Sequence, residues 1–212
     1  DKRNALSILM RIEIFDCLKS WADGDHIGLV IFTGAGATFS AGFDLKEFSQ
    51  PELMSDVYKS SGAYHRIVWN FKKPTIAAIN GPALGGAFDL ATLCDIRICS
   101  PQTTFGHPEI KFGGPPLYTP LRWIIGSGLA RDLCLTGRRI DSSEAYRIGL
   151  VSEVVEKEIV DRAVSIGNII LEAPVATLQY VKGYLAGNPG KDFEESFSIE
   201  HDKPFQEMIS KS

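Results

Sequence analysis

One segment, from Lys73 to Glu109, constrains the fold of this chain more than any other. It opens with the apolar run from Thr75 to Ile79, which is bounded by a proline and by an Asn-Gly-Pro turn and predicts a buried strand. The adjacent glycines Gly85 and Gly86 lead into an apolar helical pattern, and a second apolar run follows at residues 96–99. A strand, a helix and a further strand in succession predict an α/β fold.

The glycine pair also predicts a point where a ligand approaches the backbone. Glycines at a helix start leave backbone N–H groups bare, and the helix dipole makes that point mildly positive, so a developing oxyanion is stabilised there. Asp89 lies one turn into the helix, and Glu109 follows the second strand, between Pro108 and Ile110. Two acids near an oxyanion pocket are the groups that proton transfer beside a carbonyl requires. The competing interpretation of the glycine pair is close packing of helix against strand.

This segment resembles the signature of the crotonase family, the enoyl-CoA hydratases and isomerases. The matching stretches are A-L-G-G and G-G-A-F-D-L around the glycine pair, H-P-E-I around Glu109, and S-A-G-F-D-L at residues 40–45. The similarity extends from the K-R-N-A-L-S segment at residues 2–7 to the tail. The resemblance implies an α/β fold with a spiral core of ββα turns and a C-terminal helical trimerisation region. It also implies an acyl-CoA thioester as the substrate.

By this resemblance, the backbone N–H groups of Phe43 and Gly86 form the oxyanion hole for the thioester oxygen. Glu109 moves a proton to or from the substrate carbon, and Asp89 holds and polarises the attacking water. The expected reaction is hydration of the 2,3 double bond of an enoyl-CoA. Coenzyme A is part of the substrate, and no metal or redox cofactor is expected. The residues expected to bind its CoA portion are Lys46 near the phosphates, Arg3, Ala41, Asp44, Leu45 and Gly85.

The chain departs from the hydratase pattern at two places. Standard hydratases carry glutamate where this chain has Asp89, whose side chain is one methylene shorter. Dienoyl-CoA isomerases resemble this chain at Asp89 and Glu109, but they have a further aspartate eight residues after the glutamate, where this chain has Leu117. The loop from Gly113 to Tyr118 also differs, and an aromatic or alicyclic acyl group is one interpretation. An isomerase, or another crotonase-type reaction such as thioester hydrolysis, is therefore the alternative to a hydratase.

A non-catalytic or RNA-binding homologue is a third hypothesis. RNA binding calls for a lysine-rich face, but the helix predicted from Ala5 to Trp21 offers only Arg11 and Lys19. The net charge of −4 gives no reason to expect nucleic acid or an anionic membrane as a partner. No apolar run approaches the ~20 residues of a membrane span, and nothing resembles a signal peptide. The expected compartment is the cytoplasm, or the mitochondrial matrix if the source is eukaryotic.

Cysteine and histidine spacing gives no sign of a metal site. The four cysteines lack CxxC spacing, lie in apolar elements and are predicted to be reduced core thiols: Cys17, Cys94, Cys99 and Cys134. The four histidines show no ligand spacing either. His107, immediately before Pro108-Glu109, either lines the pocket or bonds to the backbone of a turn.

The pattern along the chain predicts one unit without internal repeats. Residues 1–125 are expected to form the ββα core with the acyl-CoA site, and residues 126–212 a helical region for oligomerisation and for covering the pocket. A homotrimer or a dimer of trimers is expected. The first residues resemble the interior of a longer family member, in which a strand precedes them. In the first expected helix, 5–22, apolar residues recur at helical spacing: Leu6, Leu9, Ile12, Phe15 and Leu18. The other expected helices are 45–48, 51–71, 129–135, 142–148, 159–171, 176–186 and 193–209. The remaining expected strands are 27–33 and 151–155.

Overall fold

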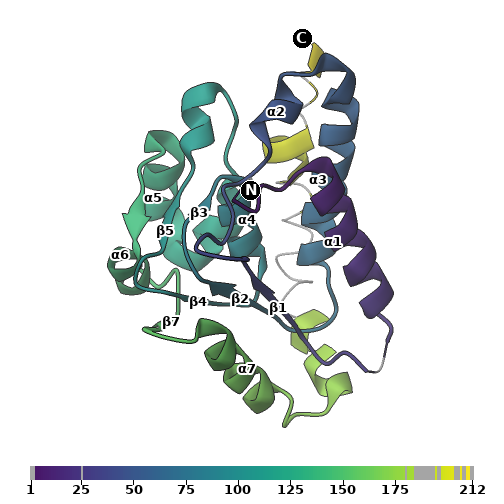
Figure 1. Ribbon diagram of the computed structural model, residues 1–212, viewed down its shortest axis with the longest axis vertical. Helices are drawn as coiled ribbons and strands as arrows, with labels where there is room; N and C mark the ends of the chain where they lie inside the picture. Colours follow the sequence, from purple (N-terminus) through teal and green to yellow (C-terminus); the bar gives the residue numbers. More distant parts are fainter. Residues whose placement is uncertain are drawn as a thin grey trace.

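Two small sheets at the centre of the molecule are wound from successive turns of one spiral (Figure 1). The structure, a computed structural model, describes residues 3–24, 26–179, 181–183, 194, 197–202, 206 and 209–210. The helical elements are α1 (Ile8–Trp21), α2 (Leu45–Phe48), η1 (Pro51–Leu53), α3 (Met54–Trp69), α4 (Gly86–Leu93), η2 (Pro108–Phe112), α5 (Tyr118–Thr136), α6 (Ser142–Arg147), α7 (Ile159–Ile170) and η3 (Ser198–Asp202). The strands are β1 (Val30–Thr33), β2 (Thr75–Ile79), β3 (Ala83–Leu84), β4 (Ile96–Cys99), β5 (Thr104–Gly106), β6 (Ile140–Asp141) and β7 (Glu153–Val154).

The two middle turns of the spiral, β2-β3-α4 and β4-β5-α5, each contribute one strand to each sheet and then a helix. The first sheet has the order β1-β2-β4-β7 and is parallel throughout. The second has the order β3-β5-β6, with β3 and β5 parallel. A single parallel bridge connects Ser40 to Ala83 of β3, and another connects Phe43 to Leu6. S-A-G-F-D-L therefore begins beside β3, and the glycine pair directly follows this strand.

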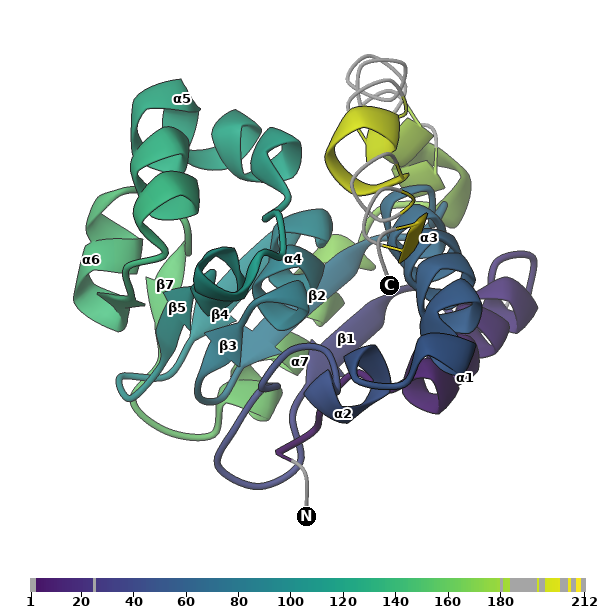
Figure 2. The ribbon, with the colours of Figure 1, turned by 90° about the horizontal axis from the view of Figure 1, so that it is seen from above.

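Strand β2 is buried on both faces, which explains its unbroken apolar sequence. Ile76 and Ala78 pack with Ile98, Ile159 and other apolar side chains in a cluster that includes residues of α7. Ala77 and Ile79 face the main core, on the side of the sheet occupied by α1, α3 and α4. Viewed from above, α1 and α3 lie on one side of the molecule and α5 and α6 on the other, with α4 between them (Figure 2). This central helix carries Asp89.

Most of the elements predicted from the sequence are present. The strands at 75–79 and 96–99 and the helix at 45–48 match residue for residue, and the others differ mainly at their ends. One prediction was too short: the helix expected at 129–135 is the second part of α5, which begins at Tyr118 and bends at Gly126, where φ is 79°. In the predicted helix 176–186, the described residues 176–179 and 181–183 are helical, whereas the predicted helix 193–209 is described only in part, mainly as η3.

Helix α1 forms as predicted, but only part of the predicted apolar set is buried, namely Leu6 and Leu18. Leu9 and Ile12 are exposed, whereas Arg11 is fully buried. The Arg11 guanidinium donates hydrogen bonds to the Leu6 carbonyl and Ser60 Oγ, and it forms an ion pair with Glu47 at 3.4 Å. Burial of a charged group is tolerated only when such partners replace water. Apolar periodicity alone gave no signal for this arginine.

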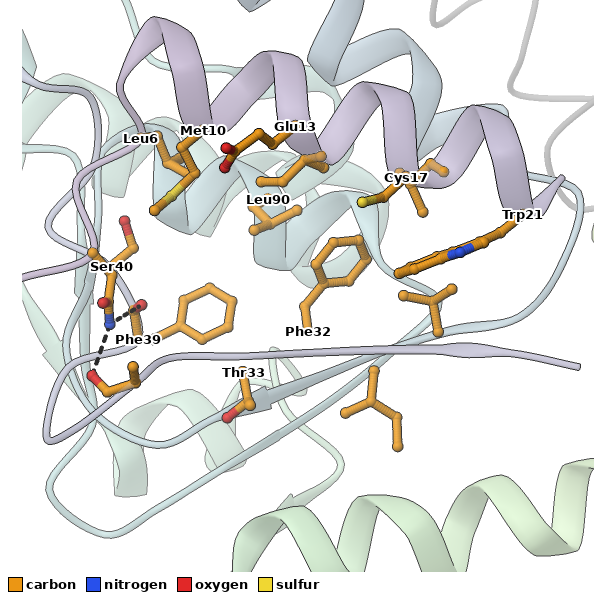
Figure 3. Close-up of a pocket in the computed structure, with 16 residues that line it drawn as sticks. Leu6, Met10, Glu13, Cys17, Trp21, Phe32, Thr33, Phe39, Ser40 and Leu90 are labelled. Atoms are coloured by element: carbon orange, nitrogen blue, oxygen red, sulfur yellow. Dashed lines mark hydrogen bonds between the residues drawn. The ribbon is translucent and has the colours of Figure 1, made fainter. Parts of the chain in front are cut away.

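An apolar groove of about 450 Å³ lies between α1 and β1 (Figure 3). Met10, Trp21, Phe32 and Phe39 are among the side chains that line it. Cys17 also lines this groove and is exposed, so the prediction that it is a core thiol was wrong, because its side chain lies in the open groove and not in the core. The other three cysteines are buried and free, as predicted.

Candidate active site

The glycine pair shapes the turn that joins β3 to α4. Gly85 has φ 55° and ψ −129°, a conformation that side-chain-bearing residues rarely adopt, and α4 begins at Gly86. A Cβ atom added to Gly86 would lie 2.5 Å from the Phe43 ring. Both glycines are therefore required for close approach, and the structure places the two predicted oxyanion donors next to each other. No backbone carbonyl of the described residues accepts a hydrogen bond from the N–H of Phe43 or Gly86.

Glu109 lies beside this turn, in the first turn of η2. A Cβ atom added to Gly85 would lie 3.1 Å from Glu109 Oε2. This oxygen is buried, and within the described part of the chain it has no hydrogen-bond partner. A buried carboxyl oxygen without a protein partner, next to two bare backbone N–H groups, is suited to act on a bound ligand.

His107 links the two predicted acids. Its Nδ1 lies 2.9 Å from Glu109 Oε1 and 3.9 Å from Asp89 Oδ1. The ring is fully buried and stacks on Phe88 with a centroid separation of 4.7 Å. Burial lowers the pKa of His107, but the hydrogen bond with Glu109 and the charges of Asp89 and Glu109 outweigh it and raise the pKa above its ordinary value. Of the two interpretations of this histidine, the structure supports the pocket residue and not the backbone-bonded one.

A second histidine, His65 on α3, faces Asp89 from the other side and was not predicted. Its Nε2 lies 4.0 Å from Asp89 Oδ2, and its Nδ1 lies 2.8 Å from the carbonyl oxygen of Ser61. The side chain is buried, and burial, followed by the nearby His201, lowers its pKa well below the ordinary value. The sequence gave only a weak signal for this residue, a histidine among the buried positions of a helix.

The η3 segment packs over α3 next to His65. Ser61 Oγ is hydrogen-bonded to His201 Nε2, and His201 Nδ1 lies 2.9 Å from Asp202 Oδ1. Arg66 donates to Asp202 Oδ2 at 2.6 Å. The His65 and His201 rings meet edge to face with centroids 5.5 Å apart. These contacts pack η3 against the His65 ring.

Four of the residues predicted to bind coenzyme A, Ala41, Asp44, Leu45 and Lys46, lie just before α2 or in its first turn, whereas Gly85 lies at the start of α4. Lys46 and Arg3 are exposed, and the Arg3 carbonyl accepts a hydrogen bond from the Ala41 N–H at 3.0 Å. Leu45 is also exposed. Asp44 is buried, and its carboxylate caps α2 by accepting the Lys46 N–H at 3.1 Å, so this side chain already has a structural role.

Leu117 occupies the position at which dienoyl-CoA isomerases have a further aspartate. Its side chain is buried, with 4% of its surface exposed. An apolar side chain there cannot move a proton. In the part of the chain that the structure describes, no group of three or more His, Cys, Asp or Glu side chains is arranged to hold a metal ion. None of the described helices combines the length and the apolar composition needed to cross a membrane.

Comparison with known proteins identifies relatives of this chain. The family model for enoyl-CoA hydratase/isomerase matches residues 1–211. A probable mitochondrial enoyl-CoA hydratase of Dictyostelium discoideum is 39% identical over an alignment that covers 73% of this chain and 57% of the relative. A 4-chlorobenzoyl coenzyme A dehalogenase of an Arthrobacter species is 31% identical, with 91% and 74% covered.

A solved structure of an enoyl-CoA hydratase from Bacillus anthracis shares the fold, with a TM-score of 0.84 and 29% identity. It is matched over the whole of this chain and 85% of its own. The crotonase-type α/β fold predicted from the sequence is thereby confirmed. The chain spans only 57% of the length of the Dictyostelium relative.

Proposed function

The chain belongs to the enoyl-CoA hydratase/isomerase family, and from this premise we propose that it adds water across the 2,3 double bond of an enoyl-CoA thioester. The observation that carries the proposal is the position of Glu109 Oε2, which is buried beside Gly85, has no hydrogen-bond partner among the described residues and lies at the turn that presents the N–H of Gly86. An acid placed there reaches the carbon next to a carbonyl whose oxygen lies at the two N–H groups.

In the proposed reaction, the backbone N–H groups of Phe43 and Gly86 donate to the thioester oxygen. Addition at the β-carbon places negative charge on this oxygen, and removal of one such donor typically costs about 3–4 kcal/mol. Only the backbone of each residue takes part, so a phenylalanine serves as well as a glycine at position 43. Exclusion of water by the Phe43 ring strengthens both hydrogen bonds.

Two acids divide the proton transfers. Glu109 acts through Oε2, because Oε1 is hydrogen-bonded to His107 Nδ1. The water oxygen bonds to the β-carbon, its proton passes to the Asp89 carboxylate, and Glu109 gives its proton to the α-carbon. One water is added in total, and exchange with solvent returns both acids to their starting states.

We propose that the reaction requires no metal or redox cofactor and that coenzyme A enters only as part of the substrate. Lys46 in α2 and Arg3, whose carbonyl accepts a hydrogen bond from Ala41, are exposed cations. We propose that they contact the phosphates of coenzyme A. The predicted trimer or dimer of trimers and a cytoplasmic or mitochondrial-matrix location form part of the same proposal. So does the division of the chain into a ββα core up to residue 125 and a helical region after it.

Double-bond isomerisation is the second candidate. Asp89 has the shorter side chain, and Glu109 alone is sufficient to carry a proton between two carbons. Leu117 weighs against a dienoyl substrate, since a third carboxylate is missing there. The dehalogenase relative, which by its name acts on 4-chlorobenzoyl coenzyme A, favours an aromatic acyl group for the altered loop at residues 113–118.

Product analysis distinguishes these reactions. The full chain is incubated with crotonyl-CoA, a 3-enoyl-CoA and a cyclic dienoyl-CoA, and the products are identified by mass. We expect crotonyl-CoA to gain the mass of one water. A shifted double bond without change of mass, and no hydration of crotonyl-CoA, would replace the hydratase by an isomerase. Release of free coenzyme A would identify a thioester hydrolase.

A further inference from the structure

A narrow, buried gap separates two polar atoms at the α3–α4 contact. His65 Nε2 and Asp89 Oδ2 are 4.0 Å apart. His65 has 1% of its surface exposed, and its Nε2 has no hydrogen-bond partner among the residues that the structure describes. A buried ring nitrogen left without a partner is costly, and its position opposite a carboxylate requires an explanation.

The hydrogen-bond network assigns the tautomer of His65. Its Nδ1 lies 2.8 Å from the Ser61 carbonyl oxygen, which only accepts hydrogen bonds, so Nδ1 carries the proton. The neutral ring then presents a lone pair at Nε2. Burial and the cationic or titratable neighbours His201, Arg11 and Arg66 lower the pKa of the ring and keep it neutral, and Asp89 is the acid that faces it.

Two acceptors therefore face each other across the gap. At 4.0 Å they are too far apart for a direct hydrogen bond. A water molecule that donates both of its O–H groups, each at about 2.8 Å, holds its two acceptors roughly 4 to 4.5 Å apart. The observed separation fits such a water, whose oxygen lone pairs then point away from both acceptors.

We propose that His65 and Asp89 together hold the attacking water, with His65 Nε2 accepting one O–H and Asp89 Oδ2 accepting the other. The inference rests on the proposed hydration and adds a residue to it. During attack the transferred proton goes to Asp89, while His65 stays neutral and fixes the direction of the oxygen lone pair. A second fixed acceptor also compensates for the short reach of the aspartate, because one contact alone leaves the water free to rotate.

The first test is structural and independent of activity. A crystal structure of the full chain without ligand is expected to show an ordered water within about 3.2 Å of both His65 Nε2 and Asp89 Oδ2. The same water is expected to be absent from the His65→Leu variant. Absence of the water from the wild-type structure would overturn the proposal.

The second test separates water handling from proton transfer at carbon. Exchange of the α-protons of butanoyl-CoA with deuterium oxide, followed by NMR, requires the oxyanion donors and Glu109 but no attacking water. His65→Leu is expected to slow hydration of crotonyl-CoA roughly tenfold to a hundredfold and to leave the exchange rate within about threefold of wild type. His65→Gln, which keeps an acceptor near the Nε2 position, is expected to recover most of the hydration rate.

The matched control is His26→Leu, the same change at an exposed histidine, which is expected to alter neither rate. Equal losses of hydration and exchange in His65→Leu, or no recovery in His65→Gln, would show that His65 only supports the fold and would overturn the proposal. A wild-type protein that exchanges α-protons but does not hydrate crotonyl-CoA would refute the proposed function. The presence or absence of the ordered water between His65 Nε2 and Asp89 Oδ2 would then test the water site independently of the hydration activity.

Discussion

His107 and His65 lie on two sides of the same carboxylate, yet their pKa values shift in opposite directions. Nδ1 of His107 is 3.9 Å from Asp89 Oδ1, and Nε2 of His65 is 4.0 Å from Asp89 Oδ2. Both rings are buried, and burial lowers both pKa values. The pKa of His107 is nevertheless raised, whereas that of His65 is lowered.

The difference lies in the partner at hydrogen-bond distance. His107 has the Glu109 carboxylate at 2.9 Å, whereas His65 has a neutral backbone carbonyl at 2.8 Å. Asp89 lies about 4 Å from both rings, so the directly bonded Glu109 carboxylate distinguishes the raised pKa of His107 from the lowered pKa of His65. In the proposed reaction, the side with His107 and Glu109 handles the proton for carbon, and the side with His65 handles water.

Removal of the carboxylate beside His107 is expected to have the largest effect. Glu109→Gln should reduce hydration by a factor of about 10² to 10⁴, because it deletes the general acid. The pKa of His107 should fall as well, since its anionic partner is lost. Turnover of crotonyl-CoA and an NMR titration of the histidine rings measure the two effects, and acyl-CoA binding should change little.

Glu156→Gln, the same substitution at an exposed position, serves as the control and should have wild-type turnover. Near wild-type hydration by Glu109→Gln would remove Glu109 from the mechanism. An unchanged pKa of His107 in that variant would show that Glu109 is not the cause of the contrast between the two histidines.

Neutralisation of the carboxylate that both histidines face should have a smaller and more selective effect. Asp89→Asn is expected to slow hydration on the order of a hundredfold and to slow double-bond isomerisation much less, because the aspartate handles water. Rates with crotonyl-CoA and a 3-enoyl-CoA give the comparison. Asp161→Asn, in the first turn of α7, is the matched control. Equal losses in both assays would contradict the division of labour between the two acids.

The opposite pKa shifts should also appear as a modest pH dependence of stability. With an unfolded pKa near 6.5, the neutral His65 makes the folded state less stable as the pH falls below that value, because the unfolded chain then binds more protons. His107 acts in the opposite sense: its stabilisation is complete below about pH 6.5 and is lost as the pH rises through its raised folded pKa.

Urea denaturation at pH 7.5 and 5.5 measures this balance. His65→Gln should lose less stability between the two pH values than wild type, by at most about 1.4 kcal/mol, because an unfolded histidine takes up its proton around pH 6.5. His26→Gln should lose as much as wild type. Identical losses in wild type and His65→Gln would show that the pKa of His65 is not lowered by folding.

The sequence by itself placed the elements that short-range chemistry specifies. Strand β2 was predicted residue for residue, because a proline and an Asn-Gly-Pro turn bound its apolar run. The turn at Gly85 and Gly86 was predicted because glycine is required where φ is positive and where another ring approaches closely. The two acids were identified by their fixed spacing from this turn. These features depend on neighbours in the chain.

Only the tertiary structure decided which side chains meet across elements. The sequence favoured Leu9 and Ile12 as buried residues of α1, but Arg11 is buried, because Glu47 and Ser60 come to it from distant segments. His65 gained its place opposite Asp89 through the packing of α3 against α4, and no spacing along the chain encodes that contact. The backbone turn and the acids were determined locally, whereas the charge of each histidine depends on which group folding brings within 3 Å.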